Sequence, residues 1–64
     1  MSVLLYEKHN QIAYITLNRP EVLNSFNDEL NTAIGEALVD YREDPSLLVA
    51  ILSGTGRAFS TGAD

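Results

Sequence analysis

The stretch LLVAILSGTGRAFSTGAD, residues 47–64, decides how the chain is expected to fold. It begins with six consecutive apolar residues, 47–52, and then changes abruptly to small and polar ones. A short aliphatic run that ends in a Ser-Gly pair is typical of a β-strand buried on both faces. Three of the four glycines, Gly54, Gly56 and Gly62, follow and predict a loop that a ligand can approach closely. We therefore expect a rigid strand that presents a glycine-rich binding loop at its carboxyl end.

Two strands joined by a turn are expected near the amino terminus. Residues 3–7 and 12–17 are rich in apolar and β-branched side chains, and the polar residues 8–11 between them predict a β-hairpin. Asn10 suits a left-handed position in the turn, and His9 is interpreted as a solvated turn residue rather than a catalyst. Three apolar residues are expected on one face of the second strand: Ala13, Ile15 and Leu17.

An irregular loop and a helix are expected to follow. Pro20 lacks an N–H group and ends the strand pairing, and the asparagines around it suit bonds to loop backbone groups. Residues 28–44 carry apolar side chains at three- and four-residue intervals, which predicts an amphipathic helix with Asn27 or Ser25 as its N-cap. The acidic residues of its last turns are expected on a solvated face: Asp40, Glu43 and Asp44.

The composition argues against several functional classes. Sixty-four residues allow one small domain, and an apolar share of 45% is ordinary for a globular protein. The chain has no cysteine and one histidine, so a Cys/His metal site is not expected. A net charge of −5 argues against nucleic acid or an anionic membrane as the main partner. Neither a secretory signal nor an apolar run of membrane-spanning length occurs, so we expect a soluble, cytoplasmic protein.

The glycine-rich loop does not match the usual phosphate-binding motifs. The GxxxxGK[ST] pattern is absent, and Phe59 stands where the third glycine of a dinucleotide-binding GxGxxG motif would be. Ser60 and Thr61 have no histidine or lysine nearby in sequence that would activate a nucleophile. Two interpretations stay open: the main-chain N–H groups of residues 61–63 bind an oxyanion, or the segment is only a tight turn.

Two motifs give the chain a resemblance to a known family. Residues 56–64, GRAFSTGAD, resemble the GxAFxxGAD motif of the crotonase (enoyl-CoA hydratase/isomerase) superfamily. Residues 15–25, ITLNRPEVLNS, resemble the ITLNRPxxxNA stretch of the same superfamily. The resemblance implies an α/β fold, the amino-terminal part of a crotonase-type spiral of ββα units made of a hairpin, a helix, a buried strand and an oxyanion loop. Residues 1–64 are then an incomplete amino-terminal segment of a single crotonase-like domain.

The resemblance also implies a substrate and a site. The substrate would be an acyl-CoA thioester, with no further cofactor and no metal, and the backbone N–H of Ala63 would be the first oxyanion-hole donor. Arg19 would either approach the CoA phosphates or hold the loop. Ser25 stands where alanine is frequent in the family, and Thr61 stands where smaller residues are usual and bears on substrate size. The residues expected along the CoA path are Val22, Ser25, Thr61, Ala63 and Asp64.

An enoyl-CoA hydratase or isomerase, assembled as a trimer or hexamer, is the function that the resemblance implies. The acid and base residues of the family's hydratases lie beyond position 64, so residues 1–64 alone are expected to be inactive. Hydrolases, dehalogenases and ring-forming synthases of the superfamily share both motifs and remain alternatives. A non-catalytic module that uses the apolar helix and strand faces to bind a partner is the alternative from another class.

Overall fold

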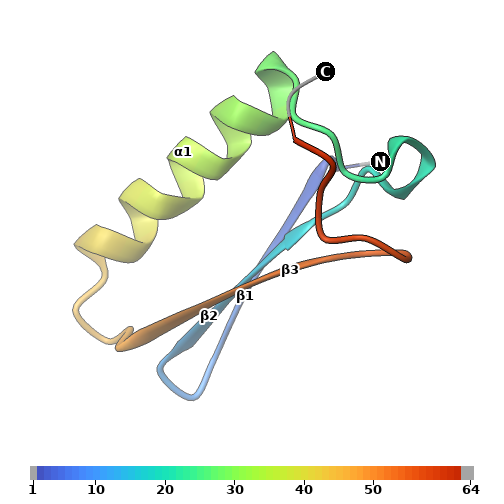
Figure 1. Ribbon diagram of the computed structural model, residues 1–64. Coiled ribbons are helices and arrows are strands. Elements are labelled where there is room, and N and C mark those ends of the chain that lie inside the picture. The colour runs from blue at the N-terminus through green and yellow to red at the C-terminus, as the bar shows by residue number, and fades with distance from the viewer. Residues whose placement is uncertain (1, 63–64) are drawn as a thin grey trace.

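A computed structural model describes residues 2–62, which form a three-stranded mixed sheet with one α-helix on one of its faces (Figure 1). Strand β2 lies in the centre of the sheet, antiparallel to β1 and parallel to β3. This order of elements confirms the predicted hairpin, helix and strand. The elements along the chain are β1 (Leu4–His9), β2 (Ile12–Leu17), a 3-10 helix (Pro20–Val22), α1 (Asp28–Glu43) and β3 (Val49–Gly54).

The hairpin turn is shorter than the sequence predicts. Asn10 and Gln11 are its only two residues, with φ angles of 52° and 70°, as a two-residue turn with both positions left-handed requires. The left-handed position of Asn10 is therefore confirmed. His9 is not a turn residue: it ends β1 opposite Ile12, and its ring meets the ring of Tyr14 edge to face at a centroid distance of 5.9 Å.

The core lies between α1 and the central strand. Ala13, Ile15 and Leu17 of β2 are fully buried, which confirms the predicted alternation of that strand. Leu30 and Ala37 of α1 are the buried residues on the helix side. Burying a large aliphatic side chain contributes about 1.5–3 kcal/mol. The face of β2 that α1 covers therefore accounts for much of the stability of the fold.

Helix α1 begins with a side-chain cap. Asn27 is in an extended conformation, and its Oδ1 accepts a hydrogen bond from the N–H of Leu30 at 2.9 Å. This confirms Asn27 as the N-cap and excludes Ser25 from that role. The acidic side chains at the other end are not simply a solvated face, because Asp40 and Asp44 both pair with Lys8 of β1, at 2.7 and 2.9 Å.

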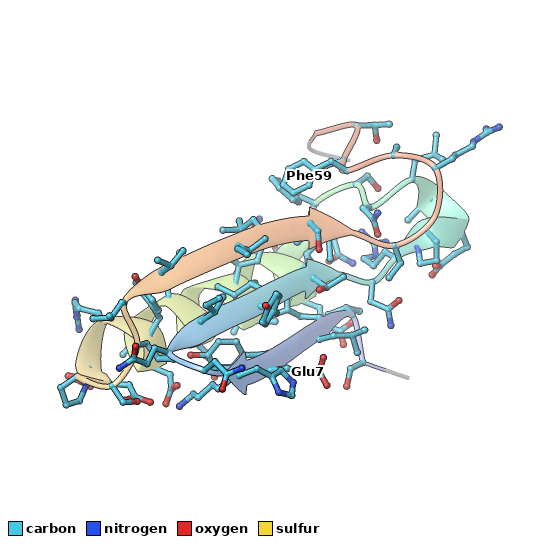
Figure 2. All side chains as sticks on the ribbon, turned by 90° about the horizontal axis from the view of Figure 1, so that it is seen from below. Glu7 and Phe59 are labelled. Carbon is cyan, nitrogen blue, oxygen red and sulfur yellow. The ribbon has the colours of Figure 1, made fainter. Side chains whose placement is uncertain are left out.

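Strand β3 is much less buried than its sequence predicts. Leu47, just before the strand, is buried, but Val49, Ile51 and Leu52 expose 51%, 43% and 47% of their surface. Val49 and Ile51 pair with Ile12 and Tyr14, so they lie on the sheet face opposite α1. Leu52 lies on the face of α1, but the helix packs mainly over β1 and β2. Figure 2 shows the sheet face opposite α1, which carries Glu7 and which no element of residues 2–62 covers. The predicted burial on both faces is therefore not found within these residues.

The one α-helix of residues 2–62 is not long and apolar enough to cross a membrane.

Candidate functional site

The loop after β3 and the coil after β2 meet at one end of the sheet. Because β2 and β3 are parallel, their carboxyl ends lie side by side, and the segments that follow them run together (Figure 1). The backbone N–H of Thr55 donates to the carbonyl of Leu17 at 2.9 Å, and its hydroxyl donates to Oδ1 of Asn18 at 3.1 Å. The two sequence motifs that lie far apart along the chain are thus neighbours in space.

Asn24 joins the two segments. Its side chain is fully buried, and its Nδ2 atom donates to the carbonyls of Thr55 at 2.8 Å and Ala58 at 2.9 Å. Its Oδ1 atom accepts the backbone N–H of Arg19 at 2.6 Å. The high asparagine content of this coil predicts such side-chain to backbone bonds, but it does not identify Asn24 as the residue that connects the coil to the loop.

Gly54 is required by this close packing. A Cβ atom built on it would lie 2.6 Å from the carbonyl oxygen of Phe59, 2.8 Å from Nδ2 of Asn24 and 2.9 Å from the carbonyl oxygen of Ala58. Any side chain at this position would push the loop away from the end of β3. Gly54 therefore serves to bring the loop back against the sheet and the coil.

The end of the loop is tied to the segment that leads into α1. The hydroxyl of Ser60 donates to the carbonyl of Asn24 at 2.8 Å and accepts the N–H of Gly62 at 3.0 Å. The backbone N–H of Phe26 donates to the carbonyl of Gly62 at 2.8 Å. Gly62 has a φ of 97°, which a glycine adopts without strain. These bonds fix the backbone up to residue 62, and they make Ser60 a structural residue of the loop.

The predicted site residues divide between these two segments. Ser25 is buried and lies in the coil, where its N–H donates to the carbonyl of Val22 at 3.2 Å. Val22 ends the 3-10 helix with 39% of its surface exposed, and Thr61 is exposed next to Gly62. The Phe26–Gly62 bond brings the segments of Ser25 and Thr61 together. Ala63 and Asp64 lie outside the described residues.

Arg19 holds the coil in place. Its Nη1 atom donates to the carbonyl of Ser25, and its own backbone carbonyl accepts the N–H of Asn24 at 2.7 Å. Of the two predicted roles, this geometry supports the one in which Arg19 stabilises the loop.

The site segments provide main-chain groups rather than acid–base pairs. Within residues 18–27 and 55–62, Glu21 is the only carboxylate. No set of three or more histidine, cysteine or acidic residues in the described part of the chain is arranged to hold a metal ion. The described site segments therefore carry exposed side chains at Val22 and Thr61 and no pair of carboxylates.

The clearest electrostatic interactions lie elsewhere, between β1 and the carboxyl-terminal turn of α1. Hydrogen bonds to Asp40 and Asp44 raise the pKa of Lys8. Bonds from Lys8 and Tyr6 lower the pKa of Asp40, and bonds from Ser46 and then Lys8 lower the pKa of Asp44 to about 2. Partial burial, followed by the bond to Asp40, raises the pKa of Tyr6. These groups connect β1 with the end of α1 and lie outside the candidate site.

Comparison with known proteins identifies the family. Residues 7–64 match the family model described as enoyl-CoA hydratase/isomerase. The chain is 44% identical over 59 residues to (E)-benzylidenesuccinyl-CoA hydratase of Thauera aromatica, covering 91% of this chain and 23% of that protein. It is 39% identical over 64 residues to 1,2-epoxyphenylacetyl-CoA isomerase of Escherichia coli, covering 100% of this chain and 24% of that protein.

A solved structure confirms the predicted fold class. The crystal structure of an enoyl-CoA hydratase from Mycobacterium marinum superimposes with a TM-score of 0.94 at 45% identity, covering 97% of this chain and 29% of that one. The chain spans about a quarter of the length of the curated relatives named above. The hairpin, α1, β3 and the glycine-rich loop match the amino-terminal part of the crotonase fold. The chain therefore belongs to the enoyl-CoA hydratase/isomerase family, the crotonase superfamily, and aligns with the amino-terminal quarter of its relatives.

Proposed function

We propose that residues 1–64 form the acyl-CoA-binding amino-terminal part of an enoyl-CoA hydratase/isomerase-type enzyme. In this enzyme the backbone N–H of Ala63 stabilises the thioester oxygen as it gains enolate character. The relatives named above are a hydratase and an isomerase of CoA thioesters. An oxyanion donor serves any reaction of a CoA thioester in which negative charge develops on the thioester oxygen. The family's hydrolases, dehalogenases and synthases are the alternatives for the overall reaction.

The bond from the Phe26 N–H to the Gly62 carbonyl is the observation that carries this proposal. The Gly62 carbonyl, bound to the coil, thus holds in place the last described residue before the proposed donor. A preorganised donor of this kind is typically worth ~3–4 kcal/mol in the transition state. Because the donor is a main-chain group, an alanine side chain is sufficient at this position.

The proposed path of CoA follows the edge where the two site segments meet. Val22 in the coil and Thr61 in the loop are exposed, and Ser25 is buried in the coil three residues after Val22. Ala63 and Asp64 complete the proposed path through their backbone. Thr61 is larger than the residues usual at its position in the family, so we expect it to limit the size of the acyl group near the thioester.

The remaining parts of the proposed enzyme come from protein beyond these residues. They supply the general acid and base and the second oxyanion donor, because the described site segments contain no pair of carboxylates. They also supply cover for the exposed apolar side chains of β3. We propose the trimeric or hexameric assembly of the family for the complete enzyme, with an acyl-CoA thioester as its substrate.

The test uses an enzyme of full family length that carries residues 1–64. Ala63→Pro removes the proposed N–H and keeps a small side chain, and Ala63→Gly retains the N–H as the control. We expect Ala63→Pro to lower kcat/KM by roughly 100- to 1,000-fold. Affinity for a thioether analogue, which lacks the carbonyl oxygen, should be unchanged, and circular dichroism confirms folding. A folded Ala63→Pro enzyme with normal turnover would exclude the oxyanion role.

A further inference from the structure

We infer that Asn24 is a positioning residue that places the oxyanion loop on the coil before α1. Its role rests on the function proposed above, since it acts through the backbone that leads to Ala63. Asn24 itself touches neither the thioester nor the acid–base groups. Its effect is on the location of residues 55–62 relative to the end of β2.

Every polar group of Asn24 forms a hydrogen bond, and three of these bonds join the coil to the loop. Both hydrogens of its buried amide point to loop carbonyls, those of Thr55 and Ala58, at 2.8 and 2.9 Å. Its Oδ1 accepts from the N–H of Arg19 at 2.6 Å, and its own N–H returns a bond to the Arg19 carbonyl at 2.7 Å. Its backbone carbonyl accepts the hydroxyl of Ser60 at 2.8 Å. The residue is completely buried, so water cannot replace any of these bonds.

The geometry at position 24 suits asparagine better than its closest relatives. The φ of 56° is left-handed, a conformation that asparagine tolerates better than most residues. Aspartate has the same shape, but an ionised carboxylate has no hydrogen to donate to the carbonyls of Thr55 and Ala58. Glutamine has one more methylene group, which would displace its amide from the carbonyls of Thr55 and Ala58. The amide of asparagine is therefore matched to this site in both length and donor number.

The bonds of Asn24 extend to the last described residue of the loop. Ser60 connects the Asn24 carbonyl to the N–H of Gly62, which directly precedes the proposed donor. A displacement of about 1 Å in such a group can cost ~100-fold in rate, because the donor must meet the oxyanion and not the ground-state carbonyl. We therefore expect the loss of the Asn24 amide to lower kcat far more than it weakens the binding of CoA.

The test compares Asn24→Asp with Asn31→Asp in the same full-length enzyme. Asn24→Asp removes both amide donors to the loop, whereas Asn31→Asp makes the same chemical change at an exposed position of α1, outside the two site segments. We expect Asn24→Asp to lower kcat about 100-fold with an unchanged Kd for a thioether CoA analogue. Asn31→Asp should keep the kcat of the parent enzyme. Equal losses in kcat and in thioether affinity would show that Asn24 only maintains the fold, and a normal kcat would overturn its role entirely.

Ser60→Ala keeps the test decisive if Asn24→Asp does not fold. It leaves the Asn24 side chain intact and removes the bridge from the Asn24 carbonyl to Gly62. A several-fold fall in kcat at constant thioether affinity is expected, and no change in kcat would overturn the claim that Asn24 acts on the proposed donor through Ser60 and Gly62. The Ala63→Pro enzyme separates the two proposals. If Ala63→Pro is active while Asn24→Asp is inactive, the oxyanion assignment of Ala63 fails. If Ala63→Pro is inactive while Asn24→Asp is active, the oxyanion assignment stands and only the role of Asn24 is rejected.

Discussion

The Nδ2 atom of Asn24 lies 2.8 Å from the position that a Cβ atom on Gly54 would occupy. The end of β3 and the coil after β2 are therefore packed so closely that the absence of a side chain at Gly54 is part of the site. Two loop carbonyls, of Phe59 and Ala58, approach the same position to 2.6 and 2.9 Å. Backbone atoms cannot rotate away as the end of a flexible side chain can.

Gly54→Ala should consequently destabilise the folded protein by about 1–3 kcal/mol, as overpacking in a tight site does. Gly35→Ala is the matched control, because a Cβ at this exposed helix position meets nothing within 4 Å. That change should stabilise the protein by roughly 0.5–1 kcal/mol through helix propensity. Urea unfolding followed by circular dichroism measures both values. Equal effects of the two substitutions would contradict the packing described for Gly54.

The N-cap of α1 gives a second prediction. Asn27→Ala removes the bond from the Leu30 N–H to Oδ1 and should cost about 1 kcal/mol of stability. Asn31→Ala, an exposed position inside the helix, should instead be neutral or stabilising by a few tenths of a kcal/mol. Thermal unfolding of the two variants distinguishes the roles. A loss of stability in Asn31→Ala as large as that in Asn27→Ala would mean that Asn27 does not act as a cap.

The exposed sheet face gives a third prediction, which links the fold to the proposed enzyme. Ile51 lies on the sheet face opposite α1, because it pairs with Tyr14 of β2, and it exposes 43% of its surface. Ile51→Thr should change the stability of residues 1–64 by only about 0.5 kcal/mol, as at other surface positions. In an enzyme of full family length, where we propose that this face is covered, the same change should cost about 1–3 kcal/mol. Equal costs in the two proteins would show that the face stays exposed.

The fold was largely predictable because its signals are local. The alternation of Ala13, Ile15 and Leu17 and the helical spacing of residues 28–44 each depend on neighbours in sequence. The features that were predicted wrongly from the sequence depend on long-range packing. His9 belongs to β1 because it pairs with Ile12. Strand β3 is exposed because no element of residues 2–62 covers the face opposite α1 and because the helix packs mainly over the other two strands. Neither fact follows from the composition of the segment concerned.

The candidate site was predictable only as two motifs. Their resemblance to one family identified the glycine-rich loop and the coil, and β2 and β3, being parallel, bring them together. The bonds that Asn24 forms with Thr55 and Ala58 span 31 and 34 positions of the chain, and no periodicity or spacing signals such a contact. Likewise, the pairing of Lys8 with Asp40 and Asp44 could not be inferred from a helix face that reads as solvated.

The pairing of Lys8 with Asp40 and Asp44 makes the free energy of unfolding depend on pH. Hydrogen bonds from Ser46 and then Lys8 lower the pKa of Asp44 to about 2, below its ordinary 3.8, and the pKa of Asp40 is lowered as well. The unfolded chain therefore binds these protons at a higher pH than the folded protein does. The stabilisation is fully present above the ordinary pKa and is lost as the pH falls from about 4 to about 2. We expect the free energy of unfolding to decrease over this range at low ionic strength.

In Lys8→Met, the free energy of unfolding should fall less steeply between pH 4 and pH 2. The substitution removes one bond to Asp40 and one to Asp44, so both pKa values rise toward 3.8. Asp44 keeps its bonds from Ser46, so its pKa should rise only in part. Arg42→Met is the control, since Arg42 lies 3.9 Å from exposed Glu43 and contacts neither aspartate in the described network. Carboxyl NMR titration of Asp40 and Asp44, with urea unfolding between pH 2 and pH 5, measures both effects. An acid dependence in Lys8→Met as steep as in the parent protein would mean that Lys8 does not hold the edge strand to the helix through these carboxylates.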